Sequence, residues 1–133
     1  MKWIIKVETD IMDLEHIRGT AKLGDKEKPV VVVVFKLKRP IAPNEAKDAA
    51  DLLRAYIAEF AKPKETEVVV LSGRGPIWFY GLVQHLVQHT VGALAYFDPK
   101  VGGAVIVASH RYDMPEEGQV LSFDEELKSR LVQ

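Results

Sequence analysis

The chain has 133 residues, which is the usual size of one domain, and we expect a single domain over residues 1–133. Its 18 basic and 19 acidic side chains give a formal net charge of −1. That balance argues against binding of duplex nucleic acid, which calls for a basic excess. The absence of cysteine excludes disulfides, a thiolate nucleophile and a cysteine-bound zinc ion. The longest apolar run, residues 30–35, is far shorter than a membrane span, and the N-terminus lacks the apolar core of a signal peptide, so we expect a cytoplasmic protein without membrane contact.

The first third of the chain predicts strands. Residues 3–9 predict a strand, which the stretch up to residue 24 can join as a hairpin. Residues 24–29 are polar and turn-forming, which predicts a loop. The β-branched apolar run at residues 30–35 lacks alternation, which is typical of a strand buried on both faces.

The rest of the chain alternates between predicted helices and strands. A helix is predicted from Asn44 to shortly before Pro63, with a buried apolar stripe that includes Phe60. The remaining predicted elements are a buried strand at 68–71, a helix ending near His89, strands at 93–97 and 104–109 joined by a turn, a strand at 119–123 and a short helix from Asp124.

The order strand, helix, strand, helix, strand calls for right-handed crossovers between parallel strands. We therefore expect a single α/β domain with a mixed, mainly parallel sheet flanked by helices, Rossmann-like in the loose sense. The hairpin after Asp98 adds an antiparallel edge to that sheet.

The loop at residues 72–76, with the sequence Ser-Gly-Arg-Gly-Pro, follows a predicted buried strand and opens a helix. In open α/β sheets, ligands bind in the crevice at the carboxyl ends of the strands, where such a loop lies. The free amides of the first helical turn favour anions, and the glycines let a ligand approach the backbone closely. Arg74 offers a planar fork to phosphate, and Trp78 can stack on a base. The alternative is a capped turn with a solvated arginine, since the loop matches neither the Walker nor the dinucleotide motif. The candidate ligand-binding residues are Ser72, Gly73, Arg74, Gly75, Pro76 and Trp78.

The segment LSGRGPIW at residues 71–78, with Asp98-Pro99-Lys100 and Ser109-His110 behind it, resembles the third CRISPR-associated ring nuclease family, the Csx-three proteins. The resemblance covers about residues 68–123 and, more loosely, residues 35–44. It implies a CARF-like fold that binds cyclic tetra-adenylate, the second messenger of type III CRISPR immunity, and cleaves it with Mn²⁺. It also implies homodimers that assemble with the ligand into a tetramer or filament.

His85 and His89 lie four residues apart, hence on one face of the predicted helix. Such a pair can bind a metal, but it is more often a boundary feature of a packed helix. The resemblance places a working histidine at the end of this helix. Counting forward from the loop puts Gln88 there, and counting back from Asp98 puts His89 there. We choose His89, because an amide cannot replace imidazole as a base.

Residue type alone gives an ordinary structural explanation for Asp98 and Lys100, which lie in a predicted turn, and for His110, which follows a predicted strand. The resemblance implies more, namely that His89, Asp98, Lys100 and His110 are catalytic. It also implies that Asp98 and His89 hold Mn²⁺. The carboxylate would hold the cation, and the ammonium would offset charge on the phosphate. Lys100 replaces the arginine expected in the family, which keeps the charge and loses the bidentate fork.

The length of the predicted strand at 93–97 constrains how these residues meet. At about 3.3 Å per residue, Asp98 should lie some 20 Å or more from His89. We therefore expect the groups to meet around one phosphate only where two subunits face each other. The two expected clusters are Ser72, Arg74, Asp98 and Lys100 at one end, and His89 with His110 at the other.

The residues and the resemblance together predict a Mn²⁺-dependent phosphodiesterase that degrades cyclic tetra-adenylate and ends type III CRISPR signalling. The alternatives are a non-catalytic module that binds or sequesters the messenger, a metal-dependent ribonuclease acting on linear RNA, and a structural subunit without a ligand. Gln88 and Lys100 are the features that favour the non-catalytic module.

Overall fold

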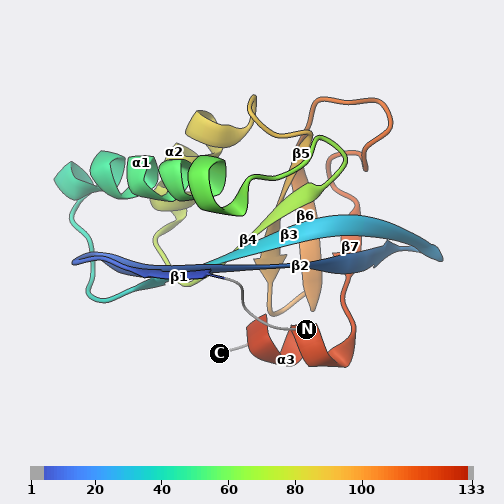
Figure 1. The fold of residues 1–133 in the computed structure, drawn as a ribbon, viewed down its shortest axis with the longest axis horizontal. Helices are drawn as coiled ribbons and strands as arrows, with labels where there is room; N and C mark the ends of the chain where they lie inside the picture. Colours follow the sequence, from blue (N-terminus) through green and yellow to red (C-terminus); the bar gives the residue numbers. More distant parts are fainter. Residues whose placement is uncertain (1–4, 132–133) are drawn as a thin grey trace.

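The computed structural model describes residues 5–131, in which all strands belong to one sheet, ordered β1 to β7 along the chain (Figure 1). The strands are β1 (Ile5–Glu8), β2 (Met12–Leu23), β3 (Lys26–Leu37), β4 (Val68–Ser72), β5 (Ala93–Asp98), β6 (Gly103–Ser109) and β7 (Val120–Ser122). The helical segments are the 3₁₀ turn η1 (Pro43–Glu45), α1 (Ala46–Tyr56), the π-helical turn η2 (Ile57–Ala61), α2 (Ile77–Val87) and α3 (Glu125–Leu131).

The sheet closes on itself, because β7 pairs not only with β6 but also with β2, where Ser122 lies opposite Lys22. Only the β3–β4 and β4–β5 pairs are parallel, and the others are antiparallel. The expected Rossmann-like or CARF-like α/β fold, with a mainly parallel sheet flanked by helices, is therefore wrong. The fold is a closed mixed β-barrel of six strands, β2 to β7, with few helices, and β1 extends it beyond β2.

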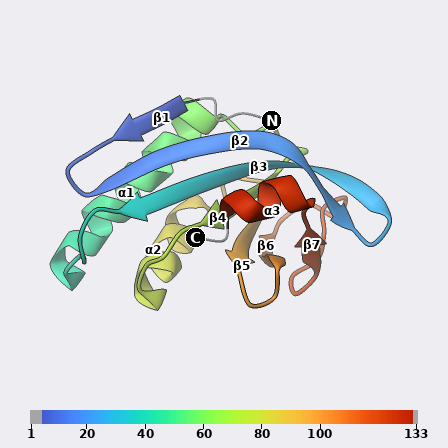
Figure 2. The same ribbon diagram turned by 90° about the horizontal axis from the view of Figure 1, so that it is seen from below.

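The β2–β3 hairpin is the reason for this difference. The predicted loop at 24–29 is only a two-residue turn, in which Gly24 has φ +65°, and β3 already begins at Lys26. Both strands are therefore twelve residues long. Twist accumulates along such a hairpin, and its far end curves round until it meets β7 (Figure 2).

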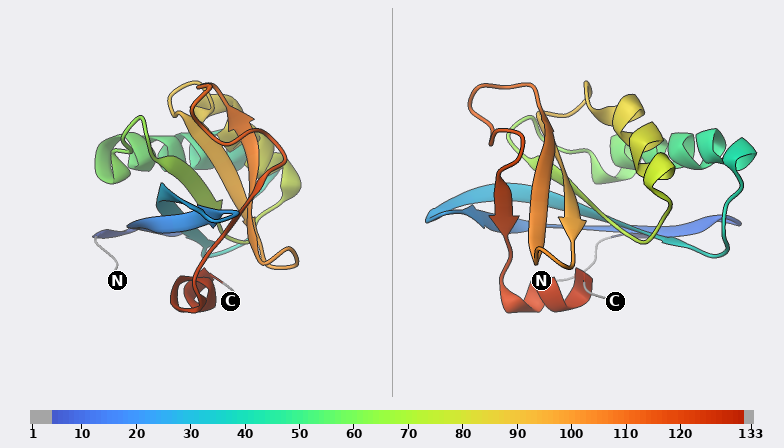
Figure 3. Two further views of the ribbon diagram at one scale, coloured as in Figure 1. Left: turned by 90° about the vertical axis from the view of Figure 1, so that its right-hand side faces the viewer. Right: turned by 180° about the vertical axis from the view of Figure 1, so that it is seen from behind.

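Two apolar cores lie on the two faces of the sheet. Alternate residues of β3 and β4, such as Val32 and Val70, point into the barrel, whereas Val33 and Leu71 face α1 and α2. The valine run is thus buried on both faces, as predicted. Helices α1 and α2 lie on one side of the sheet and α3 on the other (Figures 1 and 3). Among residues 5–131, no helix has the length and apolarity to cross a membrane.

The helix predicted from Asn44 does not keep one geometry to its end. It begins as a 3₁₀ turn, continues as α1 and widens into the π-helical turn η2 before Lys62, which has φ +45°. The wider turn changes the angle between successive side chains. Phe60 is therefore 42% exposed and stacks on Tyr56, instead of lying in the buried stripe.

His16 is a buried titratable group in β2, with 1% of its surface exposed and its Nδ1 atom 2.8 Å from the Tyr56 hydroxyl. Burial, and after it the charge of Arg18, lowers the pKa of His16 below its ordinary value of 6.5. The unfolded chain therefore binds a proton at this residue at a higher pH than the folded chain does. The folded state is then expected to lose stability as the pH falls below about 6.5.

Urea unfolding at about pH 7.5 and about pH 5 tests this expectation. The wild type should lose more stability between the two conditions than a His16→Gln variant, which keeps a polar partner for Tyr56 but does not titrate. The same loss of stability in both proteins would show that His16 does not contribute to the pH dependence.

Candidate functional site

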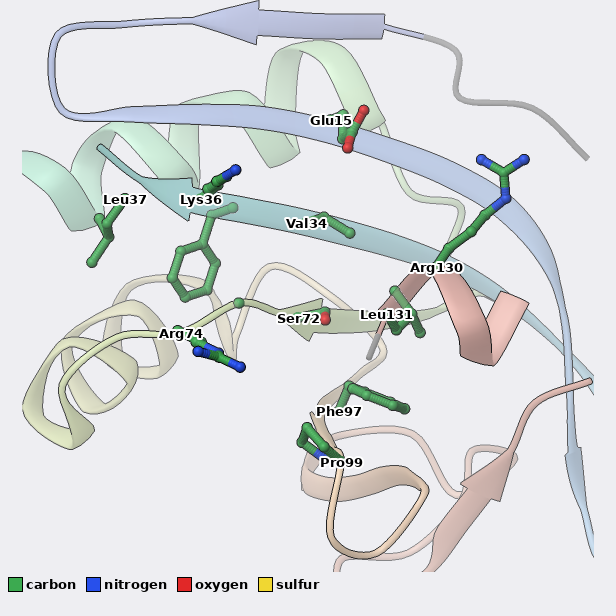
Figure 4. Close-up of a pocket in the computed structure, with 12 residues that line it drawn as sticks. Glu15, Val34, Lys36, Leu37, Ser72, Arg74, Phe97, Pro99, Arg130 and Leu131 are labelled. Carbon is green, nitrogen blue, oxygen red and sulfur yellow. The ribbon is translucent and has the colours of Figure 1, made fainter. Parts of the chain in front are cut away.

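A cavity of about 460 Å³ lies at the carboxyl ends of β3, β4 and β5, beside the last turn of α3 (Figure 4). Its volume falls in the range of about 300–1,000 Å³ that is typical of small-molecule pockets. The three strands run parallel to one another, so their carboxyl ends meet at one edge. The lining residues are Glu15, Val34, Phe35, Lys36, Leu37, Ser72, Gly73, Arg74, Phe97, Pro99, Arg130 and Leu131.

Ser72 ends β4 and lines the cavity beside Val34, its register partner in β3. The residue is only 3% exposed, yet its hydroxyl has no hydrogen-bond partner within the described residues 5–131. Buried polar side chains normally have such a partner. The hydroxyl is therefore available to a molecule that enters the cavity.

Arg74 lies at the rim of the same cavity and is exposed (Figure 4). It forms no ion pair with any residue in the described part of the chain. A guanidinium that no carboxylate neutralises can take an anion with two parallel hydrogen bonds. The geometry thus favours a ligand-binding arginine over one held in an internal ion pair.

Gly73 is required by the packing of the loop on β3. A Cβ atom at this position would clash with the carbonyl oxygen of Phe35. Ligand approach is therefore not needed to explain this glycine. An Ala substitution would push the loop away from β3 and disturb the cavity wall.

Two tyrosines support the loop from behind. The Tyr80 hydroxyl donates a hydrogen bond to the carbonyl oxygen of Gly73, and the Tyr96 hydroxyl lies 3.0 Å from the carbonyl oxygen of Tyr80. Burial raises the pKa of Tyr80 well above its usual range and that of Tyr96 to about 12. Both hydroxyls therefore keep their protons at physiological pH and hold the loop in place.

The second half of the predicted loop lies outside the cavity lining. Pro76 precedes the first turn of α2, where no side chain caps the free amides. Trp78 is 39% exposed and Ile77 is 88% exposed. Gly75, Pro76 and Trp78 are thus available at the surface beside the cavity, whereas Ser72, Gly73 and Arg74 line it.

Asp98 shapes the turn between β5 and β6. Its Oδ1 atom accepts a hydrogen bond from the Lys100 amide at 2.9 Å, and its carbonyl oxygen accepts one from Gly102, which has φ +77°. Phe97 of β5 and Pro99 of the turn line the cavity, whereas Asp98 and Lys100 do not. Both predicted residues therefore lie next to the cavity but outside its wall.

His89 and His110 lie side by side and exposed, with their ring centroids 4.8 Å apart. The amide of His110 donates a hydrogen bond to the carbonyl oxygen of Gly92, just before β5. Asp98 ends that strand, about 20 Å away at the rise of an extended chain. The histidine pair and the cavity thus lie at opposite ends of β5.

The implied Mn²⁺ ion does not fit the residues of a single chain. Within residues 5–131, no three His, Asp or Glu side chains come close enough together to hold a metal ion. Asp98 and His89 are separated by the length of β5. The histidine pair alone is also a poor match, because Mn²⁺ prefers oxygen ligands.

The cavity residues Glu15, Lys36, Arg130 and Leu131 are not indicated by any sequence motif. Lys36 follows the apolar run at 30–35, near the end of β3, so the rule that ligands bind at the carboxyl ends of parallel strands indicates it. Glu15 and Leu131 come from opposite ends of the sequence. Glu15 lies at the cavity because it is opposite Val34 in the β2–β3 hairpin, and Leu131 lies there because α3 packs against the barrel core.

The family model of the CRISPR-associated protein Csx3 matches residues 34–122, a segment that includes the loop, both histidines and the strand ends of the cavity. The chain belongs to the Csx3 family. This confirms the family predicted from the loop and the elements behind it. An uncharacterized protein of Aquifex aeolicus (strain VF5) is 35% identical to this Csx3 chain over 111 residues, which make up 83% of this chain and 87% of the relative. No solved structure matches the chain significantly.

Proposed function

We propose that this Csx3 protein is a phosphodiesterase that binds cyclic tetra-adenylate and cleaves it, which ends type III CRISPR signalling. The observation that carries the proposal is the position of Arg74, which lies exposed and without an ion pair in the described residues, on the rim of a cavity that also holds the unpartnered hydroxyl of Ser72. A cyclic oligonucleotide offers a phosphate to the guanidinium and sugars and bases to the cavity.

The proposed active site forms between subunits. Arg74 and the His89–His110 pair lie at opposite ends of the fold, so one phosphate can touch both only when two protomers of a dimer, tetramer or filament face each other. The imidazoles would then move protons and Lys100 would offset the charge of the phosphate. We propose Mn²⁺ as a cofactor of that assembly only, because the ligands of one chain do not come together.

A second candidate is a module that binds the messenger without cleaving it. It is favoured by Gln88 at one of the two possible positions of the family histidine, and by the lack of a three-ligand metal cluster within the described chain. Such a protein would bind the ring and leave it intact when Mn²⁺ is supplied.

One experiment separates these functions. The protein is incubated with cyclic tri-, tetra- and hexa-adenylate and with linear poly-adenylate, in Mn²⁺ or in chelator, and the products are followed by chromatography. We expect cleavage of cyclic tetra-adenylate in Mn²⁺ alone. Binding without products would establish the sequestering module, and equal cleavage of the linear strand would establish a ribonuclease.

Replacing Arg74 with Ala should weaken binding of cyclic tetra-adenylate by roughly 10- to 150-fold, because a hydrogen bond to a charged group contributes about 1.5–3 kcal/mol. The affinity of Arg74→Lys should lie between that of Arg74→Ala and that of the wild type, because lysine keeps the positive charge and loses the two parallel hydrogen bonds of the guanidinium. Calorimetric titration in chelator measures both. Arg54→Ala is the control, because Arg54 is an exposed arginine of α1 that pairs with Asp51 outside the cavity. Equal affinities for all four proteins would exclude Arg74 from the site.

A further inference from the structure

The cavity has an apolar floor and charged groups at its mouth. Phe97 and Leu131 are each 7% exposed and belong to the core of the barrel, and the partly buried Val34 packs against the same core. The exposed charged residues Lys36 and Arg74 lie around the opening (Figure 4). Two half-buried charged residues, Glu15 and Arg130, also line the cavity, and Figure 4 shows their charged ends pointing away from Phe97 and Leu131. The floor between Phe97 and Leu131 is thus apolar, and the charged groups lie around it.

This separation decides which part of a nucleotide can enter. A phosphate on the floor would lose its hydration without a cation to pair with it, which is costly. Loss of hydration costs a planar base little there, because its faces pack well on aromatic and aliphatic side chains. Phosphates are therefore expected at the mouth, beside Arg74 and Lys36, and a base on the floor.

Ser72 supplies a polar contact that such a base requires. Its hydroxyl lines the cavity and has no hydrogen-bond partner among residues 5–131, although only 3% of the residue's surface is exposed. A hydroxyl both donates and accepts hydrogen bonds. Adenine carries ring nitrogens that accept and an amino group that donates, so it matches this hydroxyl in either direction.

We infer that the cavity is a base-binding subsite, in which one adenine of the ring lies between Phe97 and Leu131, with Ser72 as its hydrogen-bond partner. The inference rests on the proposed function and adds a specificity role for α3. Leu131 lies beyond the segment matched by the family model, which ends at residue 122. The C-terminal helix therefore completes a subsite that the family-matched residues leave open on one side.

Leu131→Trp tests the inference, because the larger ring would fill the space assigned to the base. Affinity for cyclic tetra-adenylate, measured by calorimetry in chelator, should fall about tenfold or more, since blocking the floor removes most of the apolar burial of one base. Ser129→Trp is the matched control, because it adds the same bulk to an exposed position of α3. It should bind as the wild type does.

Ser72→Ala is the second variant, and it removes a single oxygen with little effect on packing. The loss of one hydrogen bond of about 1 kcal/mol should weaken binding about fivefold, and thermal unfolding should show a folded protein. If the wild type binds the ring but Leu131→Trp and Ser72→Ala bind it equally well, the base subsite is wrong and the proposed function stands. If the wild type binds no cyclic adenylate, both are wrong.

Discussion

Mixing an Arg74→Ala protein with a His89→Ala protein is expected to restore cleavage of cyclic tetra-adenylate, although each variant alone has lost it. Loss of a group that transfers protons typically reduces turnover by about 10²–10⁴-fold. The restoration follows from the geometry, because Arg74 lies at the cavity and His89 at the opposite end of β5. A site between subunits can draw the intact arginine from one variant and the intact histidine from the other.

The size of the effect is set by random assortment. With equal amounts of the two variants, about a quarter of the sites would hold both intact groups, so about a quarter of the wild-type rate should return. The control is a mixture of Arg74→Ala with the Arg74→Ala/His89→Ala double variant, which contains no intact arginine. The site between subunits would be refuted if the mixture were as inactive as each variant alone and the wild-type protein cleaved the ring as a monomer.

Replacing Arg18 with Met should destabilise the fold by about 3 kcal/mol, the largest loss of stability that we expect from a single change. Arg18 of β2 contacts Glu67, which is 6% exposed, with an Nε–Oε2 distance of 3.1 Å. Its Nη2 atom also donates to the carbonyl oxygens of Ala61 and Lys62 at the end of η2. In the variant the buried carboxylate keeps only the hydrogen bond from the Lys64 amide, and the carbonyl oxygens at the end of η2 lose their guanidinium partner. The loss of stability is moderated because the Arg18 side chain is 32% exposed.

A double-mutant cycle measures this pair. Urea unfolding is followed for Arg18→Met, Glu67→Met and the double variant, and the double variant should be more stable than the sum of the single losses implies, because neither charge is left alone. Additive losses would mean that the ion pair contributes nothing and that Arg18 acts through the helix carbonyl groups alone.

Local patterns in the sequence predict much of the secondary structure. The run at residues 30–35 and the strand that ends at Ser72 are buried on both faces, as their lack of alternation indicates. The loop after Ser72 lies where ligands bind at the ends of parallel strands. The errors are local as well, since polar residues at 26–29 indicate a loop but are strand residues with partners in β2.

Side-chain periodicity, chain length and the loop motif thus determined the elements, the family and the separation of Arg74 from the histidine pair along β5. Only the tertiary structure decided that β2 pairs with β7, which turns an expected open sheet into a barrel. The physical reason is that closure of the barrel depends on the twist summed over many strand pairs. No single segment of the sequence carries a pattern that predicts this sum. The packing of α3 against the barrel core is likewise a tertiary feature. It brings Leu131 to the cavity that Glu15, 116 positions earlier in the sequence, lines from its place opposite Val34.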